Sequence, residues 1–282
     1  MADRPGPVLV TGANSGFGLA SVLRFAGRGW DTWGTVRSKA KAKVLTDAAK
    51  AAGVGDRVHA VVLDVSDHDA VVAAWPKMPP FYGVVNNAGY SALGAVEEVS
   101  AAEAKRNLDV NLVAPAVVSS CALPAMRERG SGRIVMVSSI AGLAAVLPLN
   151  AWYHASKFGL EALSDVLRME VAQFGVKVSV IEPGFFKTEI ETKAKADAQE
   201  REAVDDSPYR KAYHRMQVTA GAVAAVAPPP GLVARTIVSA VESSRPLKRY
   251  LVGADALALA ATNPLLPRAI TDPLLRRLAN LG

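Results

Sequence analysis

The sequence contains a single cysteine, Cys121, among 282 residues. A disulfide framework and a cysteine-based zinc site are therefore excluded. Its four histidines follow no metal-ligand spacing, so we expect no metal ion. Aromatic side chains account for 6% of the chain and hydrophobic residues for 50%. This balance favours a parallel sheet covered by helices rich in alanine and valine.

A surface charge of one sign is also missing. Lys and Arg number 32, against 26 Asp and Glu, which leaves a net charge of +6. Residues 187–215 are densely charged but mixed in sign, which is typical of a solvated helical segment and not of a surface that follows phosphates. We therefore expect no nucleic-acid partner.

Long hydrophobic runs are absent as well. No uninterrupted apolar run approaches the ~20 residues that span a bilayer. Residues 251–267 come closest, but Asp255, Asn263 and two prolines interrupt them. Asp3 and Arg4 precede a strand expected from Val8, which leaves no room for a signal peptide. We expect a cytoplasmic protein with no membrane span.

Apolar, β-branched runs alternate with helical patterns along the chain. The expected strands are 8–11, 31–36, 58–63, 83–86, 134–138, 176–181 and 249–252. The expected helices between them are 17–28, 40–52, 68–77, 102–129 and 152–174. This alternation predicts an α/β fold, a doubly wound (Rossmann-type) parallel sheet of about seven strands with helices on both faces. We expect one domain over residues 1–282, with residues 190–230 as a helical lid inserted within it.

A glycine-rich turn joins the first expected strand to the first helix. Glycines allow the backbone to turn sharply and approach a pyrophosphate, and the helix N-terminus offers free N–H groups. The spacing is G-x-x-x-G-x-G, unlike the commoner G-x-G-x-x-G. An ordinary strand-to-helix turn is the alternative. The expected dinucleotide contacts here are Gly12, Asn14, Ser15, Gly16, Phe17 and Gly18.

Arg37 follows the second expected strand. An acidic residue there would bind the ribose 2′-hydroxyl of NAD, whereas an arginine accommodates the 2′-phosphate of NADP. No Asp or Glu occupies this strand end, and Lys39 follows Arg37. We therefore predict NADP(H) as the cofactor, with NAD(H) as the alternative. An exposed arginine without a ligand is the competing interpretation.

The next two strand ends carry polar or small residues. The Asp64 carboxylate can accept a hydrogen bond from an adenine amino group. The Asn-Asn-Ala-Gly segment at 86–89 lets the chain pass close beneath a cofactor, and its asparagines can link neighbouring strand ends. The expected cofactor contacts are Asp64, Val65, Asn87, Ala88 and Gly89.

Tyr153 and Lys157 are four residues apart on an expected helix, so they share one face with Cβ atoms ~5–6 Å apart. A free phenol has a pKa near ~10, and a cation close by favours the phenolate. The pair therefore indicates a proton-transfer site if a cofactor lies beside it. His154 points about 100° away from Tyr153, and we expect it to be structural.

Together these segments resemble the short-chain dehydrogenase/reductase family. The resemblance covers roughly residues 7–190, through TGANSGFG, Asp64, NNAG, Asn111, Ser139 in IVMVSSIAG, YHASK and PGFFKT. The run from Arg245 to Gly253 is similar, more loosely, to the hydroxysteroid and retinol dehydrogenase branch.

The resemblance implies a role for each matching residue. Tyr153 would be the general acid and base, and Lys157 would bind the nicotinamide ribose and lower the Tyr153 pKa. Ser139 would hydrogen-bond the substrate oxygen, and Asn111 would position a water that connects Lys157 to solvent. Thr188 would hold the nicotinamide carboxamide. The remaining cofactor contacts expected nearby are Pro183, Gly184 and Phe186.

Ser139 departs from the family pattern. It precedes Tyr153 by fourteen residues, one more than is usual. A one-residue insertion around 148–150 would absorb the difference, and Ser138 is the alternative serine. Pro115 lacks the N–H that would bond the Asn111 carbonyl. We expect a helix kink there, with that carbonyl free for the relay water or, alternatively, a kink that serves packing alone.

These observations predict an NADP(H)-dependent oxidoreductase that interconverts a ketone or aldehyde and an alcohol. The substrate pocket is expected to be apolar, so a lipophilic steroid, retinoid or polyketide-like carbonyl compound is favoured. Its expected walls are Leu143, Ala144, Val146, Leu147, Trp152 and Phe185, next to Ser139 and Tyr153. A catalytically silent NADP(H)-binding sensor or scaffold is the alternative function.

The expected helices 102–129 and 152–174 carry apolar residues on more than one face. The resemblance implies that these helices form subunit contacts. We therefore expect a homodimer or homotetramer.

Overall fold

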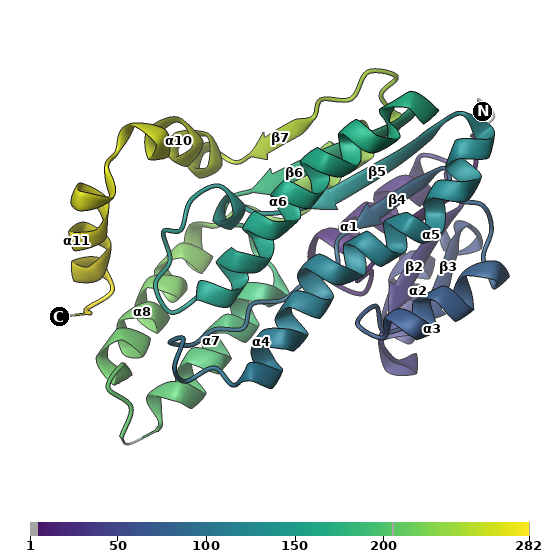
Figure 1. Cartoon of the computed structure of the whole chain (residues 1–282). Coiled ribbons are helices and arrows are strands. Elements are labelled where there is room, and N and C mark those ends of the chain that lie inside the picture. Colours follow the sequence, from purple (N-terminus) through teal and green to yellow (C-terminus); the bar gives the residue numbers. More distant parts are fainter. Residues whose placement is uncertain (1–4, 205, 282) are drawn as a thin grey trace.

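The computed structural model describes residues 5–204 and 206–281, which form a doubly wound α/β fold around one parallel sheet (Figure 1). The sheet order is β3-β2-β1-β4-β5-β6-β7. The strands are β1 (Val8–Val10), β2 (Thr32–Val36), β3 (Val58–Val62), β4 (Gly83–Asn86), β5 (Gly132–Val137), β6 (Val176–Pro183) and β7 (Arg249–Val252). The predicted fold class is confirmed, and strand order reverses between β1 and β4.

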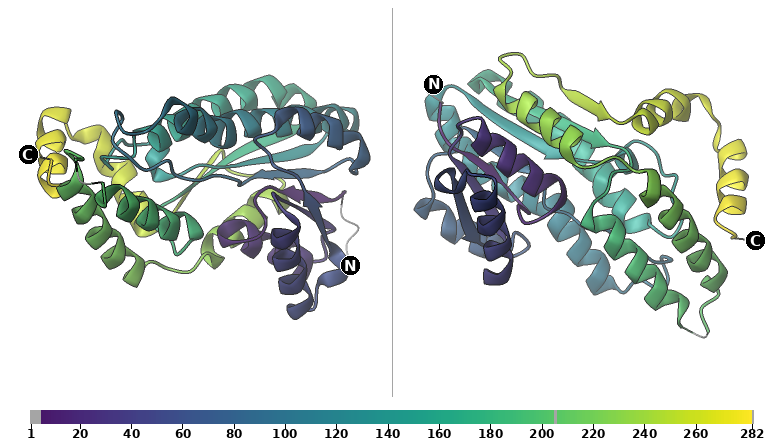
Figure 2. Two further views of the ribbon diagram at one scale, coloured as in Figure 1. Left: turned by 90° about the horizontal axis from the view of Figure 1, so that it is seen from below. Right: turned by 180° about the vertical axis from the view of Figure 1, so that it is seen from behind.

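Helices cover both faces of the sheet. The first layer, α1 (Gly16–Gly27), α2 (Lys39–Ala51) and α9 (Gly231–Glu242), shares one core with the sheet, and α1 and α9 pack against each other. The opposite layer contains α3 (His68–Ala74), α5 (Ala114–Arg129) and α6 (Ala151–Val171). The two layers are seen from opposite sides in Figure 1 and in the rear view of Figure 2.

The expected helix 102–129 is interrupted. The structure has α4 (Ala101–Leu108), a π turn (Asp109–Val113) and then α5. The Ala114 N–H bonds the Asp109 carbonyl, five residues back. Pro115 follows directly and has no N–H to donate, so the α-helical pattern cannot be continuous here. By length and composition, Ala101–Arg129 is the one helical stretch in the described residues that is apolar enough to cross a membrane. In the fold its α5 part packs against β4 and β5.

Other boundaries differ by a few residues. The expected helix 68–77 ends at Ala74 and continues as a 3-10 turn that contains Pro76, because proline cannot donate to the helical ladder. The expected helix 152–174 likewise ends in a 3-10 turn, closed by Gly175 at φ 72°. Strand β5 begins two residues earlier than predicted because Gly132 pairs with Val176.

The expected insertion 190–230 contains two helices, α7 (Glu189–Glu202) and α8 (Arg210–Val226), which pack against each other. They lie beyond the ends toward which the strand arrows point, together with α11 (Arg268–Leu278), which follows α10 (Ala254–Thr262) (Figure 1). The side chains of 189–195 lie outside the described residues, as does residue 205. Tyr213 of α8 is buried; its hydroxyl donates to Glu98 and accepts from the Ala95 N–H at 2.8 Å.

The turn between β1 and α1 depends on close backbone packing. Gly12 and Gly16 adopt φ values of 66° and 51°, in the left-handed region that favours glycine. A Cβ on Gly18 would lie 2.2 Å from the Gly12 carbonyl oxygen and 2.6 Å from Asn87 Nδ2. Gly18 therefore lets the helix approach the turn and the end of β4 without a gap.

We predict that Gly18→Ala lowers the free energy of unfolding by about 1–3 kcal/mol, because the added methyl group must push the turn away from the helix. Urea unfolding measures this loss. Gly27→Ala is the matched control on the same helix, since no heavy atom from the described residues lies within 4 Å of its Cβ position. Equal stability of the two variants would contradict this account of the turn.

Candidate active site

A cavity of about 1140 Å³ opens at the carboxyl ends of the strands, where the order reverses. Ligands of doubly wound folds bind at such a switch point. Most residues expected to contact cofactor or substrate line it. These are Gly12, Asn14, Ser15, Gly16, Phe17, Arg37, Asp64, Val65, Asn87, Ala88, Gly89, Ser139, Val146, Leu147, Tyr153, Lys157, Pro183, Gly184, Phe185, Phe186 and Thr188. Gly18, Asn111 and Leu143 do not line it.

The floor of the cavity joins β1 to β4. Thr11 Oγ1 accepts the N–H groups of Asn87 at 3.0 Å and Ala88 at 2.9 Å. Asn87 Nδ2 donates to the Thr11 carbonyl at 2.8 Å. A Cβ on Gly12 would lie 2.9 Å from the Ala88 Cα. The two strand ends therefore form one continuous, closely packed surface beneath the glycine-rich turn.

Basic side chains flank the outer end of the cavity. Arg37 is exposed and lines the cavity together with Lys41. Lys39, the basic residue noted after Arg37 in the sequence, does not line it. Asp64 Oδ1 accepts from the Ser66 N–H at 3.0 Å and from its hydroxyl at 2.7 Å. Burial alone would raise the Asp64 pKa, but these bonds and the charges of Arg106 and Arg37 bring it below its ordinary value. Asp64 is therefore a carboxylate at neutral pH.

The first two turns of α6 carry Tyr153 and Lys157. The Lys157 side chain is buried, with 4% of the residue exposed, and its Nζ donates to the Val137 carbonyl at 2.8 Å. Nζ lies 5.7 Å from the centroid of the Tyr153 ring. Burial lowers the Lys157 pKa to about 8, while the Glu161 carboxylate acts in the opposite direction. A cation thus lies close to the phenol inside the cavity.

Asn111 lies behind this pair. Its Nδ2 donates to the Tyr90 carbonyl at 2.9 Å and to Ser156 Oγ at 3.0 Å, and its Oδ1 accepts the Tyr90 N–H at 3.0 Å. A Cβ on Gly89 would lie 3.1 Å from Asn111 Oδ1 and 3.8 Å from Lys157 Nζ. Asn111 and Lys157 Nζ therefore both lie near Gly89, although Asn111 itself does not line the cavity. Ser156, inside the Tyr-x-x-x-Lys motif, is a partner that the sequence analysis missed.

Both serines of the β5 end line the cavity. Ser139 is partly exposed, and its Oγ accepts the Ala141 N–H at 3.1 Å at the start of a 3-10 turn (Ile140–Gly142). Ser138 is buried, and its Oγ has no hydrogen-bond partner among the described residues. Leu149 adopts φ 61°, an unusual value for leucine, within the segment where an extra residue was expected.

His154 holds the chain that follows Ser139. Its ring is buried, which lowers its pKa and keeps it neutral. Its Nε2 accepts the Leu147 N–H at 3.2 Å, so Nδ1 carries the proton and donates to the Ala141 carbonyl at 2.8 Å. These bonds fasten both ends of the 141–147 segment to α6. His154 therefore has the structural position that its place on the helix predicts.

The apolar part of the cavity differs from the expectation. Val146, Leu147 and Phe185 line it, but Leu143, Ala144 and Trp152 do not. The prediction for Leu143 is wrong because this residue ends the 3-10 turn and lies in a separate cavity of about 420 Å³ behind α6. A further part of the wall, missed entirely, comes from the α7–α8 segment and α11: Asp197, Glu200, Arg201, Val204, Ala212, Arg215, Met216, Thr219, Ala220, Val223, Leu275, Leu278 and Ala279.

Asp255 was also missed by the sequence analysis. Its Oδ2 accepts the Phe185 N–H at 2.7 Å, and its Oδ1 lies 2.1 Å from the position that a Cβ on Gly184 would take. Asp255 therefore requires glycine at position 184 and sets the turn after β6. No sequence motif connects residues 184 and 255, which are 71 positions apart.

Described residues of the chain include no group of three His, Cys, Asp or Glu side chains arranged to hold a metal ion.

Comparison with known proteins agrees with this geometry. Residues 7–199 match the family model for short chain dehydrogenases. An NADPH-dependent 3-dehydrocapnine reductase from Ornithobacterium rhinotracheale is 30% identical and covers 94% of each chain. The bovine (Bos taurus) 17-beta-hydroxysteroid dehydrogenase type 6 is 31% identical over 96% of this chain and 87% of its own. The crystal structure of a short-chain dehydrogenase from Streptomyces avermitilis superposes with a TM-score of 0.77 and 30% identity, covering 95% of both chains. The chain is thus an oxidoreductase that belongs to the short-chain dehydrogenase family.

Proposed function

We propose that this protein is an NADP(H)-dependent reductase that interconverts a lipophilic ketone or aldehyde and the corresponding alcohol. The observation that carries the proposal is the placement of Tyr153, Lys157 and Ser139 in the same cavity as the glycine-rich turn. A site for a dinucleotide and a set of groups that hold and move a proton are thereby adjacent.

The cavity fits a nicotinamide dinucleotide. Its volume of about 1140 Å³ exceeds the roughly 300–1,000 Å³ of a typical ligand pocket, so it has room for a cofactor and a substrate together. Gly12, Gly16 and the N-terminus of α1 suit a pyrophosphate, and Arg37 with Lys41 suits a 2′-phosphate. When bound, the reduced nicotinamide would supply the hydride. The relative from Ornithobacterium, which its name describes as NADPH-dependent, supports the same cofactor.

The protein's own groups would supply the proton and stabilise charge. Tyr153 would donate its phenolic proton to the substrate oxygen during reduction and accept a proton in the reverse direction. Lys157, held 5.7 Å from the ring centroid, favours the phenolate that remains. Ser139 Oγ already accepts the Ala141 N–H, so its own O–H is available to donate to the substrate oxygen as negative charge develops.

Asn111 would support this transfer from behind. Its side-chain bonds to Tyr90 and Ser156 hold the π turn against α6, one residue before Lys157. With Pro115 unable to donate to the Asn111 carbonyl, that oxygen would be open to the relay water that connects Lys157 to solvent. Thr188, Pro183, Gly184 and Phe186 would enclose the nicotinamide end of the cavity.

The substrate class follows from the apolar part of the cavity wall. Val146, Leu147 and Phe185 line the cavity together with Met216 and Val223 of α8, while α7 and α8 also place the charged Asp197, Glu200, Arg201 and Arg215 in its wall. An apolar wall of this kind favours a lipophilic carbonyl compound such as a steroid, a retinoid or a polyketide-like ketone. The bovine relative, named for a hydroxysteroid, supports this class. Helices α7 and α8 would act as the lid over the substrate, within a single domain.

We also propose a homodimer or homotetramer formed through α4, α5 and α6. Apolar side chains of the π turn between α4 and α5, and of α6, are left exposed in the single chain, namely Val113, Phe158, Val166 and Met169. A second copy of the chain would cover them.

Replacing Tyr153 tests the reaction. Tyr153→Phe removes only the hydroxyl, so NADPH should still bind while kcat for hydrophobic ketones falls by about 10²- to 10⁴-fold, the usual contribution of general acid catalysis. NADPH consumption across a panel of such ketones measures the loss. Tyr250→Phe is the matched control, because the Tyr250 hydroxyl accepts the Leu247 N–H and lies outside the cavity wall.

Retained turnover in Tyr153→Phe would contradict the proposed role. A wild-type protein that binds NADPH but consumes none with any ketone would instead indicate the silent sensor or scaffold.

Replacing Arg37 tests the cofactor. Arg37→Asp should reverse the charge that a 2′-phosphate would meet and shift the NADPH/NADH preference toward NADH by about 10- to 100-fold, the worth of one charged hydrogen bond. Lys39→Asp is the matched control, since it makes the same charge change two residues away and outside the cavity wall. Steady-state kcat/KM for both cofactors gives the ratio. The same ratio in both variants would overturn the assignment of Arg37.

A further inference from the structure

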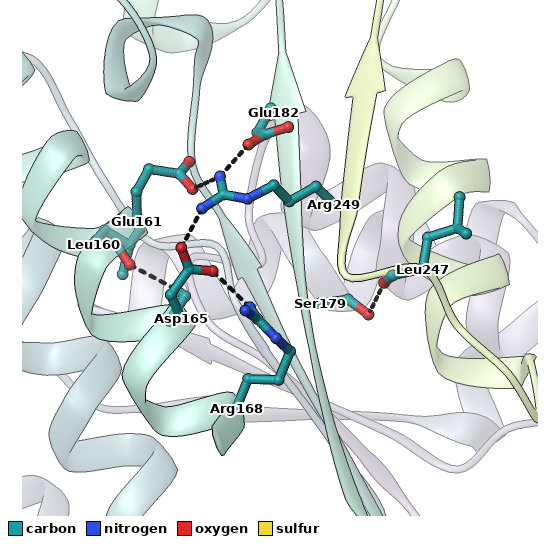
Figure 3. Close-up of polar contacts among 9 residues, drawn as sticks. Leu160, Glu161, Asp165, Arg168, Ser179, Glu182, Leu247 and Arg249 are labelled. Carbon is teal, nitrogen blue, oxygen red and sulfur yellow. Dashed lines mark hydrogen bonds and ion pairs between the residues drawn. The ribbon is translucent and has the colours of Figure 1, made fainter. Parts of the chain in front are cut away.

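Beyond Lys157, the buried side of α6 leads to a cluster of charges. Figure 3 shows Glu161 and Asp165 of α6 and Glu182 of β6 converging on Arg249 of β7. Arg249 Nη1 donates to Glu161 and, at 2.6 Å, to Glu182, while Nη2 donates to Asp165 at 2.7 Å. Three carboxylates from two elements therefore share one guanidinium.

This cluster is short of positive charge. Asp165, the most exposed of the three acids, has a second partner in Arg168 at 2.6 Å. Glu182 is 1% exposed, and burial, followed by the charge of Glu161, raises its pKa. Glu161 is 6% exposed, and its Oε1 has no hydrogen-bond partner among the described residues. Arg249 alone therefore does not satisfy Glu161.

Lys157 is the next charged side chain along the same face. Residues four apart on a helix are neighbours, and a Cβ on Gly142 would lie 3.0 Å from both Glu161 Cγ and the Lys157 carbonyl oxygen. Glu161 is the charged group whose field raises the Lys157 pKa against the effect of burial. The two side chains thus start one helical turn apart on the same face of α6, and they form no direct ion pair among the described contacts: Glu161 acts on the ammonium through its charge and not through a hydrogen bond.

We propose that Glu161 is a positioning residue for the reaction: its carboxylate, oriented by Arg249, keeps the fully buried Lys157 in the ammonium form. The inference rests on the proposed function of Lys157. A neutral amine at this place would not stabilise the Tyr153 phenolate, so the charge state of Lys157 decides whether the proton donor works. Glu161 would act through Lys157 and would not touch the substrate.

The other groups around Lys157 do not replace Glu161. On α6, Tyr153 is the partner that Lys157 serves, and Asp165 lies two turns away with Arg168 and Arg249. Glu182 of β6 accepts from Arg249 at 2.6 Å, and it is not among the groups whose charge acts on the Lys157 pKa.

Of the elements on the other sides, α4 places the charged Glu103 and Arg106 in the wall of the same cavity. The π turn contributes the neutral Asn111, and its Asp109 pairs with Lys105 of α4 at 2.7 Å. The segment that follows β5 contributes the neutral Ser138 and Ser139.

Glu161→Gln tests the proposal in the intact protein. The change keeps the shape of the side chain and removes its charge, so the alkaline limb of kcat/KM for ketone reduction should shift about one pH unit lower, within the usual effect of a nearby charge. With the Lys157 pKa near 8 in the native chain, kcat/KM at pH 9 should fall about tenfold, while at pH 6 it should change by less than about twofold.

Asp165→Asn is the matched control, because it removes another carboxylate from Arg249 without removing the one next to Lys157. We expect its alkaline limb to stay at the wild-type pH. Glu161→Asp keeps the charge but draws it back by one methylene, and its limb should shift in the same direction by less than that of Glu161→Gln. Glu161→Asp also keeps the test open if the Gln variant does not fold.

An alkaline limb at the wild-type pH in whichever Glu161 variants fold would overturn the proposal, as would an equal shift in Asp165→Asn. A purely structural role would lower activity by one factor at every pH, which also overturns it. These outcomes are distinct from failure of the proposed function, in which the wild-type protein itself would reduce no ketone.

Discussion

The site depends on a buried ammonium ion. Lys157 has lost nearly all contact with water, and burial favours the neutral form of an amine. The fold offsets this with the Val137 carbonyl at 2.8 Å and the carboxylate of Glu161 one turn away. The effective charge next to the Tyr153 phenol is the balance of these opposing effects. The proton transfer proposed for Tyr153 and Lys157 is therefore tied to the ion cluster around Arg249.

The parallel sheet explains why a cofactor site and this ammonium ion meet. All strands present their carboxyl ends at one edge of the sheet. The order in which successive strands are added reverses between β1 and β4. The glycine-rich turn follows β1, and the 86–89 segment follows β4, so they share the crevice. Strand β5 then supplies the Val137 carbonyl, the segment after it supplies Ser139, and α6 packs directly against β6. Residues more than a hundred positions apart thereby enclose one cavity.

Much of this could be predicted from the sequence because the deciding signals are local. Alternating β-branched and helical runs predicted the sheet, and a Tyr and a Lys four apart predicted a shared helix face. Pro115 indicated a break in the helix. It did not predict the π turn, in which the Ala114 N–H bonds the Asp109 carbonyl, five residues back. The assignment of Leu143 to the pocket failed since the 3-10 turn after Ser139 directs that residue behind α6.

Long-range contacts were beyond such signals. The α8 and α11 wall of the cavity comes from a segment that looks only like a charged, solvated helix and from the last residues described. Asp255 fixes the turn at Gly184 across 71 positions, and Arg249 joins Glu161 to Glu182 across three separate elements. Asp255, Glu161 and Glu182 belong to none of the motifs recognised in the sequence. Gly184 and Arg249 do lie in such segments, but their partners become evident only when the sheet is assembled.

The most direct measurement is a crystal structure of the protein with NADP(H) bound. The account predicts the pyrophosphate at the turn from Gly12 to Gly18, the 2′-phosphate beside Arg37, and the nicotinamide end next to Tyr153 and Lys157. A dinucleotide bound elsewhere on the chain, or a Tyr153 hydroxyl turned away from the nicotinamide, would contradict it.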